Sequence, residues 1–321
     1  MMPSNRNISH IFITDPFNQL QPGHDSTLLM MEFALKHGHQ VWQAEMSNLF
    51  WEQGLFVQVH SVVLDSGKVS LDNANYIKLN LSQENTGYLV WMRKDPPVDV
   101  FYIRACQLLR LSKAPVLNHP DLLMSCDEKM LALEFIDWIP TSYVLQDMTQ
   151  IRSLVFHIGK LIAKPIGQMG GRGILILHRE DSNLASLIEI LTNHGQNKII
   201  LQHYIPQAVE GDKRIFLVGG EPIGAILRVP PKGDYRANMA VGGSVEQCLL
   251  TTKEQQICNA LKKRLLQLKA YIVGLDIIGE KLTEINITSP TGLQEIARFS
   301  DVNPAEKLIQ WAENFVKASK C

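Results

Sequence analysis

The sequence predicts a mixed protein of the α/β and α+β classes, with an N-terminal parallel α/β domain, a small central domain and a C-terminal sheet domain. Three observations support this fold class: strand and helix patterns alternate over residues 8–118, the pattern changes after Asp121, and the last third is rich in strands. The 321 residues are enough for two or three domains of about 100 to 200 residues each. We expect the domains at residues 1–120, 121–203 and 204–321.

In the N-terminal part, short apolar runs and helical patterns follow each other as expected for βαβ units on a mostly parallel sheet. The first helix has a predicted N-cap at Ser26 and ends before Gly38. An inserted stretch indicates a hairpin around Asp65-Ser66-Gly67 at the edge of the sheet.

The remaining two thirds have a different pattern. A helix around Glu128–Phe135 leads into short strands and helices, and a later sheet is followed by a stretch with Gly, Pro and Asn at Pro230–Gly243. After a further helix comes a hairpin at Gly274–Asn286, in which branched apolar residues surround a Gly279-Glu280 turn. A last helix closes the sequence.

The composition excludes several classes of function. Lys and Arg number 31 and Asp and Glu number 32, so no overall charge attracts nucleic acid or an anionic membrane. The five cysteines include no CxxC pair, which argues against a zinc site or disulfides and suits a reducing cytosol. There is no signal-peptide pattern and no run near the roughly 18 apolar residues of a membrane span. We therefore expect a cytoplasmic protein that binds neither nucleic acid nor membranes.

A glycine-rich loop is the first candidate for a binding site. The segment Lys164–Gly173 has glycines that expose backbone N–H groups and allow close approach of a ligand, as a phosphate-binding turn requires. It is neither a Walker A loop nor a dinucleotide-binding turn, because it joins a strand to a strand. A glycine-rich hairpin is the alternative interpretation, but Lys164 places a cation beside the loop and favours phosphate binding.

Three oxygen-bearing side chains in the hairpin form the second candidate. Glu284 and Asn286 lie two residues apart on one strand and share a face, and the antiparallel partner brings Asp276 to within a residue or two of Glu284. Few carboxylates combined with substrate phosphates are what Mg²⁺ prefers. The alternative is a solvated sheet face, although such faces usually mix acids with Lys and Arg.

Arginines near glycines form the third and fourth candidates. Arg214 begins one strand and Arg228 ends the next, and either could be a surface residue. The stretch Lys232–Gly243 joins flexible glycines to Arg236 and Asn238, so it is either a surface loop or a mobile lid of the kind that a water-sensitive acyl transfer requires.

Seven segments together resemble one family. They are MRKDPP, CDEKM, KPIGQMGGRG, LQHYIP, EGDKR, RANMAVGG and GLDIIGEKLTEINITSPTG, and in this order they are similar to bacterial glutathione synthetase of the ATP-grasp superfamily. The similarity spans nearly the whole chain and is weakest between Trp51 and Tyr88. It implies an N-terminal α/β domain, a central lid and a C-terminal α+β domain, with ATP held between the last two.

The resemblance also implies roles for individual residues. ATP would be bound by Lys129, Lys164, Gly170, Gly171, Gln202, His203, Tyr204, Ile205, Asp212 and Arg214. Magnesium would be held by Asp276, Glu284 and Asn286. Catalysis would involve Arg228, Arg236 and Asn238, with Arg228 stabilising the oxyanion. The peptide substrate would be contacted by Asp15, Ser26, Arg93, Asp95, Ser289, Pro290 and Thr291.

By the same resemblance, the activity is an ATP-dependent ligation of γ-glutamylcysteine and glycine through an acyl phosphate, with Mg²⁺ or Mn²⁺ as cofactor. A homo-oligomer, a tetramer in the family, is expected. Two alternatives remain: another ATP-grasp carboxylate–amine ligase, and a non-catalytic nucleotide-binding protein.

The sequence departs from the family pattern at a few positions. Gly167-Gln168 stands where Asp-Gly is expected before Met-Gly-Gly, and Asp127 stands where Asn is common. Ala237 lies between Arg236 and Asn238 where Gly is frequent, and Gly292 follows Ser-Pro-Thr where Cys is familiar. None of these departures removes a cation or an expected metal ligand.

Overall fold

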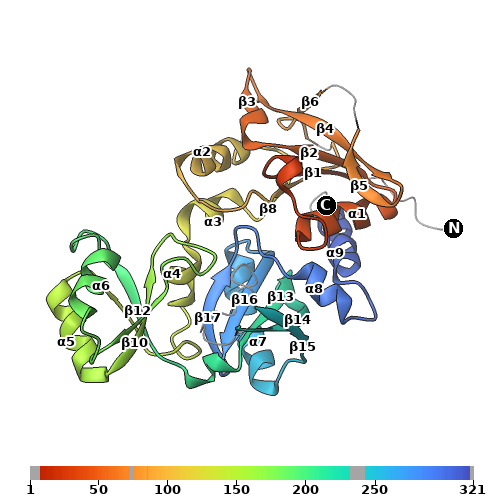
Figure 1. Ribbon diagram of the computed structural model, residues 1–321. Coiled ribbons are helices and arrows are strands. Elements are labelled where there is room, and N and C mark those ends of the chain that lie inside the picture. The colour runs from red at the N-terminus through yellow and green to blue at the C-terminus, as the bar shows by residue number, and fades with distance from the viewer. Residues whose placement is uncertain (1–7, 73–75, 85, 232–242, 319–321) are drawn as a thin grey trace.

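The computed structural model describes residues 8–72, 76–84, 86–231 and 243–318, which form three sheets (Figure 1). The N-terminal sheet comprises β1 Ser9–Ile13, β2 Gln40–Ala44, β3 Leu49–Trp51, β4 Leu55–Asp65, β5 Lys68–Leu71, β6 Ile77–Asn80, β7 Tyr88–Met92 and β8 Val116–Leu117. Its strand order is β3-β4-β2-β1-β7-β8, with β5 and β6 paired to β4. β1 runs parallel to both β2 and β7, which confirms the predicted βαβ pattern.

Two helices cover opposite faces of this sheet. α1 (Ser26–Lys36) packs on the face that carries Phe12, whereas α2 (Val100–Leu109) packs on the face of Ile11. These side chains alternate because successive residues of a strand point to opposite faces. Two short 3-10 helices, η1 Phe17–Gln19 and η2 Met46–Asn48, follow β1 and β2.

The start of α1 differs from the prediction by one residue. Asp25, not Ser26, is the N-cap, and its carboxylate accepts from Thr27 N at 2.7 Å. Ser26 is fully buried instead, and its Oγ accepts from Leu293 N at 3.1 Å. The hairpin prediction is confirmed, because Asp65 pairs with the residue that directly follows the Ser66-Gly67 turn.

The central sheet is antiparallel, with the order β11-β10-β12-β9. Its strands are β9 Ser142–Leu145, β10 Lys160–Pro165, β11 Leu175–His178 and β12 Ile199–His203. Two helices, α5 Met148–Ile158 and α6 Leu184–Leu191, pack on one face and enclose a separate small core. The glycine-rich loop joins β10 to β11, so the predicted strand-to-strand connection is confirmed.

The C-terminal sheet has the order β15-β14-β13-β16-β17. Its strands are β13 Asp212–Val218, β14 Glu221–Val229, β15 Ser244–Gln247, β16 Ile272–Ile278 and β17 Lys281–Asn286. The helices of this part of the chain are η3 Pro206–Val209, α7 Thr252–Gln267, α8 Leu293–Arg298 and α9 Pro304–Ala318. The hairpin of β16 and β17 turns at Gly279-Glu280, as predicted.

The segment between the N-terminal and central sheets packs on the C-terminal sheet. It holds α3 (Pro120–Ser125) and α4 (Glu128–Ala132), and Leu122 and Leu131 share a core with the C-terminal strands. Figure 1 places α4 beside β17, between the central and C-terminal sheets. α4 ends at Ala132, earlier than the predicted helix end at Phe135. The domain limit that we expect at residue 121 stays a prediction.

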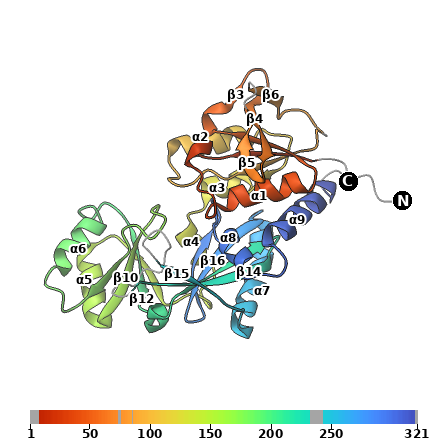
Figure 2. The ribbon, with the colours of Figure 1, turned by 45° about the vertical axis from the view of Figure 1, so that its right-hand side comes forward.

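The last helix joins the two ends of the chain. Figure 2 shows α9 lying along α1, and both helices contribute to one core with Phe12 and Phe216. Glu313 of α9 accepts hydrogen bonds from His37 Nδ1 at 3.1 Å and His39 Nε2 at 3.0 Å. The N-terminal and C-terminal sheets are thus packed together, while the central sheet has a core of its own.

Candidate active site

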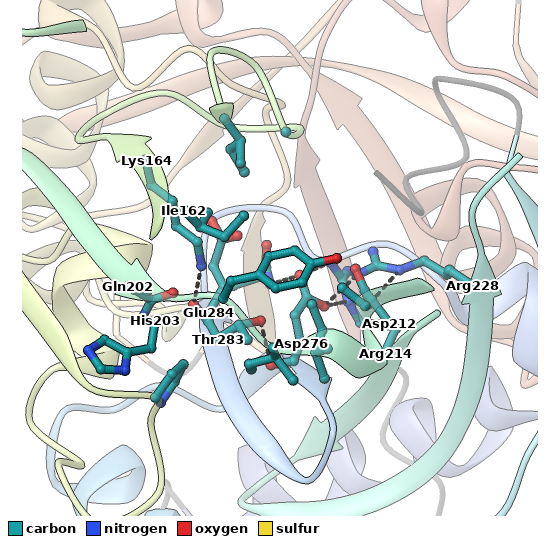
Figure 3. Close-up of a pocket in the computed structure, with 18 of the residues that line it drawn as sticks. Ile162, Lys164, Gln202, His203, Asp212, Arg214, Arg228, Asp276, Thr283 and Glu284 are labelled. Carbon is teal, nitrogen blue, oxygen red and sulfur yellow. Dashed lines mark hydrogen bonds and ion pairs between the residues drawn. The ribbon is translucent and has the colours of Figure 1, made fainter. Parts of the chain in front are cut away.

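A pocket lies between the central and C-terminal sheets (Figure 3). Many of the predicted residues line it: Lys164, Gly170, Gly171, Gln202, His203, Tyr204, Ile205, Asp212, Arg214, Arg228, Asp276, Glu284 and Asn286. They come from β10 and its loop, from β12, and from four strands of the C-terminal sheet. The fold therefore brings together residues that lie far apart in the sequence.

The hairpin of β16 and β17 supplies the acids. Asp276 and Glu284 are register partners, and the irregularity of the ladder falls just after Asp276. The amide of Asn286 donates to Asp276 Oδ2 at 3.1 Å and to Gly274 O at 3.1 Å. The predicted proximity of the three side chains is confirmed.

Asp276 is buried between two arginines. Arg214 donates to both of its oxygens, at 2.6 Å from Nε and 3.1 Å from Nη2, and Arg228 Nη2 lies 2.9 Å from Oδ1. Burial by itself would raise the pKa of Asp276, but the two guanidinium groups outweigh it and hold that pKa below its usual range. Asp276 is therefore an ionised group inside the protein.

Asp212 shares one of these arginines. It is the register partner of Arg228, which donates to Asp212 Oδ1 through Nε at 3.0 Å and through Nη2. Burial raises the pKa of Asp212, and the positive charge of Arg228 opposes that rise. Figure 3 shows Arg228 pointing toward Asp212 and Asp276 from the side opposite His203.

Arg214, which was predicted to contact ATP, lines the pocket but is held on two sides. Besides its contacts with Asp276, its Nη1 donates to Thr291 O at 3.0 Å. Gly274 and Gly292 make room for it, since a Cβ would lie 3.2 Å from Arg214 Cδ at Gly274 and 3.3 Å from Arg214 Cγ at Gly292. Arg214 thus orients Asp276 and the segment after β17.

Two lysines meet the edge of the hairpin. Lys129 Nζ donates to Glu284 Oε1 at 3.0 Å and also to Gln168 O in the glycine-rich loop. Lys164 Nζ donates to Thr283 O at 3.1 Å, and Figure 3 shows it reaching toward Glu284. Burial lowers the pKa of Lys164, and the charge of Glu284 opposes this change. Lys129 itself is not among the pocket-lining residues.

The glycine-rich loop borders the pocket through Gly170 and Gly171, which have φ values of +67° and +74°. Such backbone conformations favour glycine. Asp127 Oδ2 accepts from Gly167 N at 2.9 Å. Asp127 and Gly167, both departures from the expected family pattern, are therefore in direct contact through the Gly167 amide.

The other end of the pocket is apolar. The predicted segment Gln202–Ile205 lies there, where β12 leads into η3. Sequence reasoning missed the residues that complete this wall, namely Pro140, Ile162, Ile174, Ala208 and Ile278, as well as Thr283. Ile162 could have been found, because it lies two residues before Lys164 on the same strand and so shares its face.

The residues predicted to contact the peptide lie outside this pocket, where the N-terminal sheet meets the segment after β17. Arg93 Nη2 donates to Pro290 O at 3.0 Å, and Ser289 Oγ donates to Arg93 O at 3.3 Å. Asp15 Oδ2 accepts from Asp95 N at 2.9 Å. Burial raises the pKa of Asp95, and a hydrogen bond with Ser289 opposes the rise.

Three further predicted site residues remain: Ser26, Arg236 and Asn238. Ser26 is fully buried in the packing of α1 against α8, where it is bonded to a backbone amide. Arg236 and Asn238 lie outside the described residues.

Sequence comparison identifies the family to which this site belongs. Residues 8–123 match the model of the prokaryotic glutathione synthetase N-terminal domain, and residues 128–301 match that of the prokaryotic glutathione synthetase ATP-grasp domain. The chain belongs to the prokaryotic glutathione synthetase family. It is 41% identical to a glutathione synthetase of Synechocystis over 94% of this chain and 98% of the relative. For a glutathione synthetase of Thermosynechococcus vestitus the identity is 42%, again over 94% of this chain and 98% of the relative.

Solved structures show the fold of this prokaryotic glutathione synthetase family member. The crystal structure of D-cycloserine synthetase superposes with a TM-score of 0.65 and 11% identity, over 97% of this chain and 100% of that chain. Together with the match to the ATP-grasp domain model, this likeness confirms an ATP-grasp architecture. Among the described residues, no helix is both long enough and apolar enough to cross a membrane.

The donor set of the pocket fits a hard divalent cation. Asp276, Glu284 and Asn286 offer carboxylate and amide oxygens on adjacent strands at one pocket wall. A second group of potential ligands, formed by His37, His39 and Glu313, is less suitable. His39 Nδ1 accepts from Ile8 N at 3.3 Å, so its Nε2 carries the proton and donates to Glu313. A protonated ring nitrogen cannot bind a metal.

Proposed function

We propose that this member of the family is a glutathione synthetase, which joins γ-glutamylcysteine to glycine and converts ATP to ADP and phosphate. The observation that carries the proposal is the pocket in which Lys164 and Arg228 stand on either side of Asp276 and Glu284. Its apolar end suits a nucleobase, and its charged end suits a triphosphate beside a carboxylate. The family's relatives named glutathione synthetase support the choice of substrates.

The first proposed step is phosphorylation of the peptide. An oxygen of the cysteine carboxylate attacks the γ-phosphorus of ATP, the new O–P bond forms, and the bond from phosphorus to the β-phosphate oxygen breaks to release ADP. The attacking and receiving groups are both anions. Lys129, Lys164 and the N–H groups of Gly170–Gly171 would offset this repulsion and hold the groups in line.

The second proposed step makes the peptide bond. The amine of glycine attacks the acyl carbon and the C–N bond forms, giving a tetrahedral oxyanion. The oxyanion collapses with cleavage of the C–O bond to phosphate, and the proton lost by the amine passes to the released phosphate. Arg228 would stabilise the oxyanion, a role that requires it to keep its charge. Paired with buried Asp276 and Asp212, it has a raised pKa although burial opposes the rise, so it is charged at any physiological pH. Arg236 and Asn238 are proposed to act beside it.

A divalent cation would be held by Asp276, Glu284 and Asn286. We propose Mg²⁺, with Mn²⁺ as a possible substitute, because the donors are all oxygens and few carboxylates are present. When bound, it would neutralise charge on the phosphates. Arg214 fixes the Asp276 carboxylate by two hydrogen bonds, so one of the ligands is oriented in advance.

The peptide is proposed to bind where the N-terminal sheet meets the segment after β17. Arg93 and Asp95 would contact it together with Asp15, and the turn of Ser289, Pro290 and Thr291 would border it. This region adjoins the pocket through Arg214, which is bonded to both Asp276 and Thr291 O. A homo-oligomer, a tetramer by resemblance, and a cytoplasmic location are further proposals.

One assay tests the function. ADP release is measured with purified protein, ATP, MgCl₂ and γ-glutamylcysteine, with and without glycine. We expect ADP release that depends on both γ-glutamylcysteine and glycine. Mass spectrometry should identify glutathione as the product. No ADP release under either condition, despite measurable ATP binding, would refute an enzymatic role, and release only with another acceptor would indicate a different ligase.

A further inference from the structure

Three consecutive residues at the start of α4 each contact a different part of the site. Asp127 accepts from Gly167 N, Lys129 donates to Glu284 and to Gln168 O, and Glu128 contacts the segment after β17. α4 therefore lies at the junction of the glycine-rich loop, the hairpin that bears the acids, and the segment proposed to border the peptide. Glu128 lies in the segment CDEKM, but it was not among the residues with a predicted role.

Glu128 binds two backbone amides of the segment after β17. Its Oε1 accepts from Ile287 N at 2.7 Å and from Thr288 N at 2.9 Å, and only 4% of the residue is exposed. These two amides follow Asn286, where β17 ends, and precede the turn that begins at Ser289. Beyond β17 they have no strand partner in the sheet, so Glu128 replaces the missing ladder contacts.

We infer that Glu128 is a positioning residue, which fixes the segment from Ile287 to Gly292 so that the proposed peptide-binding turn keeps its place beside the metal-binding strand. The inference rests on the proposed function for the identity of the peptide only. Glu128 acts on this segment through the backbone, because it accepts from two backbone amides. The far end of the segment is held by Arg214 at Thr291 O and by Arg93 at Pro290 O. Its near end is held by Glu128 at two amides and by Asn118, whose Nδ2 donates to Ile287 O at 2.7 Å.

Loss of the Glu128 carboxyl would leave two buried backbone N–H groups without an acceptor, which corresponds to roughly a 10- to 100-fold change in the local opening equilibrium. The conservative variant Glu128→Gln retains an acceptor oxygen in the same place, whereas Glu128→Ala removes it. Asp99→Ala is a control at an exposed position: Asp99 also accepts from two backbone amides, Phe101 N and Tyr102 N, both at 2.9 Å, but it caps α2, which packs on the N-terminal sheet.

Amide hydrogen exchange of the full-length protein tests the inference directly. In Glu128→Ala, we expect exchange at Ile287 and Thr288 to accelerate at least about tenfold. In Glu128→Gln it should stay within about threefold of the wild type, and Asp99→Ala should leave both amides unchanged while exposing those of α2. Unaltered protection in folded Glu128→Ala would overturn the inference.

Kinetics provides the second measurement. Glu128→Ala should raise KM for γ-glutamylcysteine about tenfold while changing the dissociation constant of ADP less than about twofold, and Glu128→Gln should restore most of the loss. An equal loss of both affinities would contradict a role specific to the peptide segment. If the protein does not make glutathione, the exchange measurement still decides the inference, so the two failures are distinguishable.

Discussion

Asp276 and Glu284 are register partners across β16 and β17, yet their charges are balanced from different parts of the chain. Asp276 is paired with Arg214 of the neighbouring strand β13 and with Arg228 of β14, whereas Glu284 is paired with Lys129 of α4. Of the two carboxyl groups, Asp276 is therefore part of the C-terminal sheet's own charge network. Glu284 connects that sheet to α4 and, through Lys129, to the glycine-rich loop.

Glu284→Ala should abolish turnover with little effect on folding. The carboxylate is a proposed metal ligand at the pocket wall, so its loss should lower kcat by at least about 100-fold. Glu284→Gln keeps an amide oxygen, the type of ligand that Asn286 offers, so its kcat should fall less than that of Glu284→Ala. Its melting temperature should match the wild type, because this oxygen can still accept from Lys129. ADP release and thermal unfolding measure the two effects. Normal activity in Glu284→Ala would disprove the metal assignment, and Glu221→Gln, at an exposed ion pair, serves as the control.

Arg228→Gln should destabilise the protein strongly. The variant leaves Asp212 and Asp276 with less positive charge in a buried site, and breaking such a pair costs about 3 to 5 kcal/mol. The double variant Arg228→Gln/Asp212→Asn removes one of the remaining charges as well and should recover a substantial part of this loss. Urea unfolding of the single and double variants forms a double-mutant cycle. Strictly additive losses would show that the two side chains are not coupled.

The sequence could predict local relationships in this site better than distant ones. The pairing of Asp276 with Glu284 could be predicted from the two-residue period of strands and from a short turn, which together set the register. The contact of Lys129 with Glu284 spans 155 positions and depends on how α4 packs on β17, which no local pattern encodes. Capping was predicted one residue too late, because both Asp25 and Ser26 are good N-caps and only the packing against α8 separates their roles.

The contact between Asp127 and Gly167 leads to a third prediction. Asp127→Asn replaces one carboxylate oxygen with an NH₂ group, which cannot accept a hydrogen bond from Gly167 N. It should therefore weaken ATP binding about fivefold, the effect of roughly 1 kcal/mol. Adding Gly167→Asp places a carboxyl at the position where the resemblance leads us to expect one. Asp tolerates the φ of +77° at this position better than most residues.

Calorimetry with a non-hydrolysable ATP analogue measures how these two substitutions change ATP binding. The double variant should bind within about twofold of the wild type, and Gly167→Asp alone should bind more weakly because two carboxylates then face each other. Equal affinities in all four proteins would mean that the contact contributes nothing to the loop.

The link between α1 and α9 predicts a dependence of stability on pH. Burial would raise the pKa of Glu313, but hydrogen bonds from His37 and His39 outweigh it and lower that pKa below 4.5. Because the pKa is lower in the folded protein than in the unfolded chain, ionised Glu313 stabilises the fold above about pH 4.5, and this contribution disappears as the pH falls through the lower folded value. Glu313→Gln should therefore lower the melting temperature at pH 7, and the difference from wild type should shrink below about pH 4. Glu306→Gln, in the first turn of the same helix, should show little difference at either pH, and a loss at Glu313 that is the same at pH 3.5 and pH 7 would show that its charge is not what joins the two helices.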